Sequence, residues 1–203
     1  PSRQNRPQGQ MTGGRALAEM LRLSGAGPMF GMGGFQLLPF YDALGQLGMQ
    51  HFLINDERCG AFAADAYARV TGEVGVVIAG TGAGAAATMV GLQEAYCSSS
   101  PVLFIVSQIE QDHLHRGWGD LHEVKNQHGL ISNVVEACYD VAAPSDIPQS
   151  LQAIFSRMVH ERPRPYGLEI PVDVLNAKLT TPFSYQPVTH TPRLPDAQKL
   201  AEA

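Results

Sequence analysis

The sequence predicts an α/β fold in which helices alternate with the strands of a mainly parallel β-sheet. Two apolar runs, at residues 74–79 and 101–106, are typical of strands that are buried on both faces of such a sheet. Segments with helical periodicity lie between the expected strands, and a glycine-rich turn at residues 80–84 leads from strand to helix. Because parallel sheets bind ligands at the carboxyl ends of their strands, we expect functional residues there.

The first part of the chain contains two helix–strand pairs. Thr12 is a suitable N-cap for a helix with a leucine-rich face, and Gly25 and Gly27 are placed to end that helix. The next expected elements are a strand at residues 28–30, an amphipathic helix at residues 37–47 and a strand at residues 51–54.

The central stretch predicts a helix followed by a buried strand. Asn55 and Asp56 are good N-caps for a helix over residues 57–70, and Gly72 can end it. Small residues line nearly every side of this helix, so another backbone or a flat ligand can approach it closely. After the buried strand, the expected elements are the turn at residues 80–84 and a helix at residues 85–96.

The second half of the chain continues the alternation around a long polar loop. This loop follows the strand at residues 101–106 and is too long for an ordinary connection, which is typical of functional or mobile segments. The remaining expected elements are a helix within residues 123–135, a strand at residues 138–141, a helix capped by Ser145 and a strand at residues 166–170.

We expect one folded domain with tails. The 203 residues are 44% hydrophobic and 16% charged, which suffices for one core of ordinary size. Residues 1–10 are expected to be a disordered lead or a cloning remnant, and residues 11–176 the domain. Residues 177–203 resemble a linker and the start of a truncated middle domain, in which residues 197–203 begin a helix.

Charge and composition argue against several classes of partner. The formal net charge is -5 at pH 7 and the 14 Lys and Arg are scattered, so we expect no nucleic acid partner. No apolar run is long enough to span a bilayer, so we expect no membrane association. Cys59, Cys97 and Cys138 have neither disulfide nor metal-site spacing, which is typical of a cytoplasmic protein.

Glu57 and the glycine turn each allow a structural and a functional interpretation. In the first turn of its helix, Glu57 can stabilise the helix dipole, or it can bind a ring nitrogen of a heterocycle. Gly82, Gly84 and Ala87 match the G-x-G-x-x-A form of the dinucleotide fingerprint. The acidic residue expected after the next strand is poorly placed, since Glu110 is the first one. Close approach by a ligand or a second subunit is therefore the favoured role of these glycines.

The long loop concentrates histidines and carboxylates that could hold zinc or iron. No fixed ligand spacing is present, so we assign no metal ligand and favour a substrate-facing histidine. GxSxG, P-loop and CxxC motifs are also absent from the sequence, which removes common hydrolase, NTPase and thiol redox functions. A catalytic site therefore needs a cofactor, another chain segment, or both. The loop residues are Asp112, His113, His115, Asp120, His122, Glu123 and His128.

Seven motifs occur in a characteristic order. They are FGMGG (30–34), FYDAL (40–44), NDERCGAFAADAYARVTGEVGV (55–76), GTGAG (80–84), GLQEAYCSSSPVLFIVSQ (91–108), LHEV (121–124) and LEIPVDV (168–174). Together they resemble the N-terminal, pyrimidine-binding domain of thiamine diphosphate-dependent enzymes of the acetolactate synthase and 2-oxoacid decarboxylase group. The resemblance covers about residues 12–176 and implies a three-layer α/β/α thiamine diphosphate-binding fold.

The resemblance implies roles for individual residues. Glu57 would be the catalytic residue, which hydrogen-bonds the aminopyrimidine ring and activates the cofactor for decarboxylation of a 2-oxoacid. The acyl or aldehyde unit could then pass to an acceptor, as in acetolactate synthase. The implied cofactor-binding residues are Gly33, Gly34, Glu57, Thr81, Gly82, Ala83, Gly84 and Gln108, and the implied substrate-facing residues are His113, His115, His122 and Glu123.

The family binds Mg2+ and the diphosphate through a C-terminal domain with a GDG motif, which these residues lack. We therefore expect this piece alone to be inactive, and the complete enzyme to be a homodimer or homotetramer with its active site at the subunit interface. Leu121-His122-Glu123 stands where acetolactate synthases commonly have Phe-Gln-Glu, and Gly33 stands where the family often has Pro. A relative with another acceptor, or a simple decarboxylase, is therefore favoured over a true acetolactate synthase.

Three points stay open from the sequence. The 2-oxoacid, any acceptor and any bound FAD are not specified by the motifs. A non-catalytic dimerisation or regulatory module of the same fold is the second hypothesis, and a nicotinamide dinucleotide-binding domain is the third.

Overall fold

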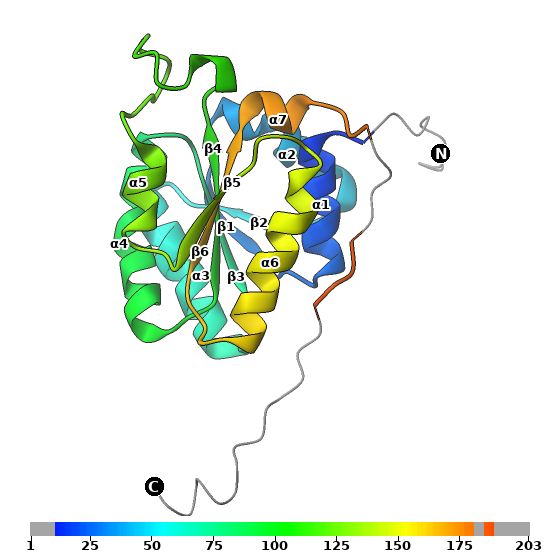
Figure 1. Ribbon diagram of the computed structural model, residues 1–203. Coiled ribbons are helices and arrows are strands. Elements are labelled where there is room, and N and C mark those ends of the chain that lie inside the picture. Colours follow the sequence, from blue (N-terminus) through cyan, green and yellow to red (C-terminus); the bar gives the residue numbers. More distant parts are fainter. Residues whose placement is uncertain (1–10, 181–184, 189–203) are drawn as a thin grey trace, which may run out of the picture.

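The computed structural model describes residues 11–180 and 185–188 (Figure 1). The expected lead at residues 1–10 and the expected helix at residues 197–203 lie outside the described residues. Helices pack on both faces of one central sheet, so the chain forms three layers (Figure 1). The predicted α/β fold is therefore confirmed.

The sheet has six strands, and every neighbouring pair is parallel. The spatial order is β2-β1-β3-β4-β6-β5, which places β3 and β4 at the centre, buried along their whole length. The strands are β1 (Met29–Met32), β2 (His51–Leu53), β3 (Gly75–Ala79), β4 (Val102–Gln108), β5 (Ala137–Asp140) and β6 (Tyr166–Pro171).

Two apolar clusters join the helices to the two faces of the sheet. The first face carries α1 (Gly13–Leu23), α2 (Leu38–Leu47), α6 (Asp146–His160) and α7 (Val172–Asn176). The other face carries α3 (Glu57–Thr71), α4 (Ala83–Ser98) and α5 (Gln127–Ser132). Two 3-10 turns, η1 (Phe35–Leu37) and η2 (Gln111–His113), lie in the loops after β1 and β4. None of the helices within the described residues is long and apolar enough to cross a membrane.

Local capping explains where the first helices begin and end. Thr12 accepts a hydrogen bond from the Arg15 backbone N–H at 3.2 Å, and Asp56 accepts one from Arg58 at 3.0 Å. Gly72 ends α3 in the left-handed conformation, with φ 75°. These three predictions from the sequence are confirmed.

Two predictions in the second half were wrong in detail. Ser145 occupies the N-cap position of α6 but makes no capping hydrogen bond, and its hydroxyl instead lies 3.4 Å from Asp146 Oδ1. The strand expected to end at Val106 continues through Gln108, because β6 pairs with these last residues. The short helix α7, which follows β6 directly, was not predicted.

Close packing of α3 against α4 depends on small side chains. A Cβ atom on Gly91 would overlap the Ala61 side chain and would lie 2.9 Å from the Phe62 nitrogen. The helices therefore approach each other until backbone meets backbone, which fixes where each of them begins at the carboxyl edge of the sheet.

Gly91→Ala should destabilise the fold, although alanine is the better helix former. Overlap with α3 costs about 1 to 3 kcal/mol, which exceeds the helix-propensity gain of about 1 kcal/mol. Gly45→Ala is the matched control, since Gly45 lies within α2 with nothing within 4 Å of its would-be Cβ. Urea unfolding should show Gly45→Ala more stable than the wild type and Gly91→Ala less stable. Equal gains in the two variants would refute the close-packing argument.

Candidate functional site

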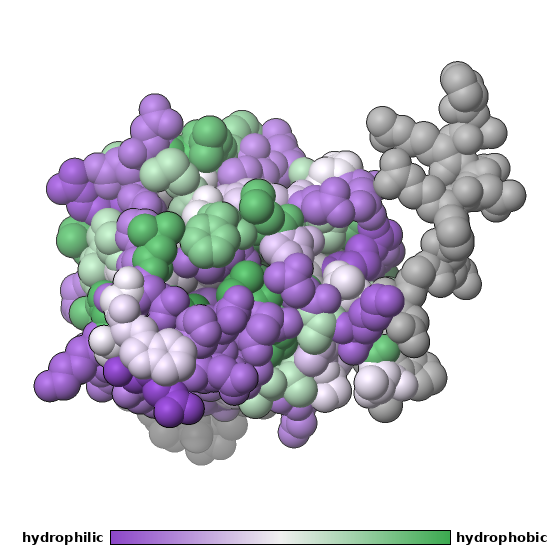
Figure 2. Space-filling model, turned by 90° about the horizontal axis from the view of Figure 1, so that it is seen from above, coloured by the Kyte–Doolittle hydropathy of each residue, from purple (hydrophilic) through white to green (hydrophobic). Residues whose placement is uncertain are grey.

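The loops that follow β1, β3 and β4 meet at the carboxyl edge of the sheet. A Cβ atom on Gly80 would lie 3.1 Å from the Gly34 nitrogen, so the first two loops touch. Gln36 reaches the long loop by donating a hydrogen bond to the Leu121 carbonyl at 3.5 Å. Viewed from above, this edge shows hydrophobic residues scattered among hydrophilic ones (Figure 2). The glycine residues predicted to line one pocket are therefore brought together.

Glu57 stands at this edge as the first residue of α3. Its side chain is half-buried and points toward α4, since a Cβ atom on Gly84 would lie 3.2 Å from Glu57 Oε1. The neighbouring Arg58 is engaged by Asp56, at 2.5 Å between Nη2 and Oδ2, so Arg58 does not neutralise Glu57. The Glu57 carboxylate therefore packs closely against the backbone at Gly84, a contact that a side chain at residue 84 would crowd.

The Gly82 turn is closed by the long loop. Gly82 has φ 60°, and a Cβ atom there would overlap the backbone carbonyl of His122. The Gly82 N–H donates to Gln127 Oε1 at 2.6 Å, and the hydroxyls of Thr81 and Ser107 are 3.0 Å apart. One of the N–H groups at the start of α4 is thus already bound, and the His122 carbonyl oxygen, which would repel a phosphate, faces the turn. This arrangement does not favour a dinucleotide site.

Buried polar side chains link the ends of β4 and β6. Glu169 Oε1 accepts hydrogen bonds from Gln108 at 2.5 Å and from Gln127 at 3.0 Å. Gln127 also donates to the Ser107 carbonyl at 2.9 Å. Burial raises the pKa of Glu169 to about 7, and the nearby Asp140 carboxylate adds to this shift. Gln108, which was predicted to bind the cofactor, therefore donates a hydrogen bond to a buried carboxyl group, Glu169, whose pKa is near neutral.

A cavity of about 770 Å³ opens over this network. It lies between the long loop and the carboxyl ends of β4, β5 and β6. Gln108, His115 and Glu123, which were predicted as site residues, contribute to its wall. Lys125 and Glu169 line it as well, so the cavity offers both signs of charge. Its size suits a small organic ligand.

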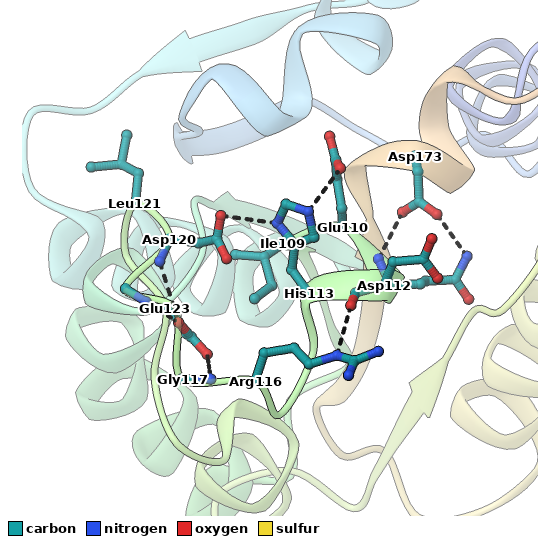
Figure 3. Close-up of polar contacts among 12 residues, drawn as sticks. Ile109, Glu110, Asp112, His113, Arg116, Gly117, Asp120, Leu121, Glu123 and Asp173 are labelled. Atoms are coloured by element: carbon teal, nitrogen blue, oxygen red, sulfur yellow. Dashed lines mark hydrogen bonds and ion pairs between the residues drawn. The ribbon is translucent and has the colours of Figure 1, made fainter.

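The long loop is held by a polar cluster around His113 (Figure 3). His113 Nδ1 lies 3.0 Å from Asp120 Oδ1, its Nε2 lies 3.6 Å from Glu110 Oε2, and its ring meets Trp118 edge-on at 5.1 Å. The hydrogen bond with Asp120 raises the pKa of His113, since it stabilises the charged imidazolium. His113 therefore acts first as a loop anchor.

The structure separates the four residues predicted to face the substrate. His115 and Glu123 line the large cavity, whereas His113 lines a smaller one of about 80 Å³. His122 is exposed and contributes its carbonyl to the Gly82 turn. Glu123 also organises the loop by accepting the N–H of Gly119 at 2.8 Å. A substrate contact by any of these four residues stays a prediction.

Several residues of the site were missed from the sequence. Gln127, Asp140 and Glu169 were not singled out, and they lie on the cavity wall beside His128, which the sequence had marked only as one of the loop histidines. Glu169 carried a usable signal, because it is a charged residue inside an otherwise apolar strand. Gln127 carried none, since a glutamine in a polar loop is ordinary and its three contacts are far apart in sequence.

Glu169→Gln should change how stability depends on pH. The folded pKa of about 7 exceeds the ordinary 4.5, so the stability contributed by this carboxyl is fully present below 4.5 and is lost as pH rises toward 7. The variant has no carboxyl group to ionise, so its free energy of unfolding relative to that of the wild type should rise by about 2 to 3 kcal/mol as the pH goes from about 5 to about 8. Urea unfolding in EDTA measures the difference. The exposed Glu161→Gln is the control, and parallel curves for Glu169→Gln and wild type would contradict the assignment.

His113 should titrate above its ordinary pKa of 6.5, because Asp120 stabilises its charged form. The stabilisation is present below that ordinary value and is lost as pH rises through the folded pKa. Asp120→Asn should lower the pKa of His113 in an NMR titration of ring protons. Asp112→Asn, which removes a weaker charge effect, should lower it less. The reverse order would show that the contact with Asp120 is not the main cause.

Comparison with known proteins gives a consistent family. A family model described as "Thiamine pyrophosphate enzyme, N-terminal TPP binding domain" matches residues 11–130. A probable 2-ketoarginine decarboxylase of Pseudomonas aeruginosa is 34% identical over 178 residues, which are 88% of this chain and 32% of that protein.

Two further relatives carry another activity in their names. An acetolactate synthase of Arthrospira platensis is 37% identical over 174 residues, 84% of this chain and 30% of that protein. The acetolactate synthase large subunit of Corynebacterium glutamicum is 33% identical over 201 residues, 94% of this chain and 32% of that protein. The chain thus spans about a third of the length of these relatives.

Proposed function

The chain belongs to the thiamine pyrophosphate enzyme family as an N-terminal cofactor-binding domain, and we propose that the whole protein decarboxylates a 2-oxoacid, with Glu57 as the residue that binds the aminopyrimidine ring. The observation that carries the assignment of Glu57 is its placement. It is a half-buried carboxylate at the carboxyl edge of the sheet. It packs against Gly84, and the adjacent Arg58 is paired with Asp56.

The residues around Glu57 fit a flat heterocycle. Gly84 lets Oε1 of Glu57 approach the start of α4 closely, and Gly34 and Gly80 bring two loop backbones together at the same edge without intervening side chains. A carboxylate in such a place can accept a hydrogen bond from a protonated ring nitrogen and hold that proton in position. Thiamine diphosphate, when bound, supplies the electron sink for decarboxylation. Orientation and proton control are what this chain would add.

The large cavity is the candidate site for a substrate of modest size, although Glu57 is not among the residues that line it. Lys125 and His115 in its wall can meet a carboxylate, Ile109 and Val141 provide apolar contact, and the wall also contains the acidic side chains of Glu123, Asp140 and Glu169. The relatives' names include a decarboxylase and acetolactate synthases, so transfer of the resulting acyl or aldehyde unit to an acceptor is an extension of the same proposal. The choice among 2-oxoacids would depend on which substrate groups contact Lys125 and His115 in the cavity wall.

The remaining parts of the proposal concern the complete protein. Mg2+ would be bound with the diphosphate by a further domain, and the site would form between subunits of a homodimer or homotetramer. The exposed side chains of Phe62 on α3 and Val90 on α4 support such an interface, since large apolar groups gain by being covered. The free thiols of Cys59, Cys97 and Cys138 support a cytoplasmic location.

The two other hypotheses are not favoured. A nicotinamide dinucleotide would place its phosphates at the Gly82 turn, where Gln127 binds the Gly82 N–H and the His122 carbonyl lies against the glycine. A non-catalytic module of the same fold has no need of a carboxylate held free at Glu57. The family match and the relatives named as enzymes point the same way.

Glu57→Gln in the full-length protein should lower kcat by roughly 10² to 10⁴. The amide keeps the shape of the side chain and can still accept a hydrogen bond, but it is neutral and cannot take up a proton from the ring nitrogen. Turnover of a panel of 2-oxoacids, with thiamine diphosphate and Mg2+ added, is the measurement. Glu161→Gln, at the far end of α6, should leave turnover unchanged. Near-normal activity of Glu57→Gln would reject the role of Glu57.

A further inference from the structure

Four side chains with metal-binding atoms converge on one side of the sheet. His128, Cys138, Asp140 and Glu169 each offer one donor atom, and these atoms all lie within 4.8 Å of one another. None of the four was assigned as a ligand from the sequence, because their spacing along the chain follows no metal-site pattern.

The strand register explains why the four residues meet. Asp140 of β5 pairs with Glu169 of β6, and Cys138 lies two residues before Asp140 on the same face. Gly167 pairs with Cys138 and leaves space for its sulfur, since a Cβ atom there would lie 2.9 Å from Sγ. Helix α5 packs over this face and brings His128 to the same point.

The side chain of Glu169 gives a second, independent observation that points to a ligand at this cluster. Its side chain is 5% exposed, and its Oε2 is buried without a hydrogen-bond partner among the described residues. The other oxygen, Oε1, is held by Gln108 and Gln127. Oε2 lies 3.8 Å from His128 Nδ1 and faces the cluster. A buried carboxylate oxygen in this position is costly unless a cation or a donor reaches it.

We propose that His128, Cys138, Asp140 and Glu169 bind one divalent cation of the zinc type. The donor set is one imidazole nitrogen, one sulfur and two carboxylate oxygens, and sulfur with imidazole selects Zn²⁺ over Mg²⁺ or Ca²⁺. Four ligands suit a tetrahedral ion, whose bonds of about 2.0 to 2.3 Å place ligand atoms about 3.3 to 3.8 Å apart. The four donor atoms are now up to 4.8 Å apart, so the longest of these distances would shorten by about 1 Å when an ion binds.

The cluster has both an entry path and support. His128, Asp140 and Glu169 line the large cavity, and the Asp140 side chain is 65% exposed, so an ion can arrive from there. His128 Nδ1 and Asp140 Oδ1 are 2.7 Å apart in a hydrogen bond, which a bound ion would replace as the two atoms separate to the ligand spacing of about 3.3 Å. Gln108 and Gln127 orient the Glu169 carboxylate in the way that outer-shell partners orient metal ligands. A bound ion would fasten α5 to β5 and β6.

Co²⁺ titration of the full-length protein, freed of metal with EDTA, tests the proposal without thiamine diphosphate. Tetrahedral binding through a thiolate gives visible d–d bands and a near-ultraviolet sulfur-to-cobalt charge-transfer band. Zn²⁺ should then displace Co²⁺ at one equivalent, whereas Mg²⁺ should not. Failure to bind Co²⁺ and Zn²⁺, or a Co²⁺ spectrum without the charge-transfer band, would overturn the site.

Variants separate the ligands from other groups. Cys138→Ser should remove the charge-transfer band, and Asp140→Asn should weaken Zn²⁺ binding by at least roughly tenfold. Asp140 is exposed, so its variant tests the site even if Cys138→Ser fails to fold, which circular dichroism reports. Cys97→Ser and His160→Gln are the matched controls outside the cluster and should bind like the wild type. An equal loss in these controls would reject the assignment. The readout is metal binding, so it stands or falls separately from the decarboxylase proposal.

Discussion

One amide side chain ties together the carboxyl edge of this sheet. Gln127 accepts the Gly82 N–H, donates to the Ser107 carbonyl and donates to Glu169, so it joins the ends of β3, β4 and β6. A single residue thereby satisfies buried polar groups that the parallel ladder leaves open at its end. The placement of α5, and with it one wall of the large cavity, depends on these three contacts.

The edge has two halves of different chemistry. On the β3 side, Glu57 is half-buried and packs against Gly84 at the start of α4. On the β6 side, Glu169 is enclosed by amides and by a histidine, which suits either a shared proton or a cation. The Gly82 turn lies between the two halves and connects them. Gln127 accepts the Gly82 N–H on one side, and α4 begins directly after Gly82 on the other.

Much of the fold was predictable because its signals are local. Caps such as Thr12 and Asp56, the terminator Gly72 and the apolar runs of β3 and β4 act over a few residues, and the structure confirms them. Ser145 shows the limit of such rules, since it occupies the N-cap position of α6 while its hydroxyl is directed to the neighbouring Asp146 carboxylate. Glu57 could be singled out because its motif is contiguous.

The other half of the edge could not be predicted for a physical reason. Glu169, Gln127 and Asp140 meet only through strand register and the seating of α5, and neither is encoded in spacing along the chain. The loop histidines were identified as a group, but their separate positions depend on backbone turns such as those at His115 and His122, which both have positive φ. Side chains in such turns point where local sequence rules give no guidance.

The contact between Gly82 and the His122 carbonyl alters how this glycine should be understood. A side chain at residue 82 would push the long loop off the sheet while leaving the strand beneath it intact. Gly82 therefore provides the packing surface for a segment forty residues later in the chain. It lacks a side chain because the His122 carbonyl occupies the position that a Cβ atom would take. Glycine patterns at strand ends can in this way report on a neighbouring loop rather than on a ligand's phosphate.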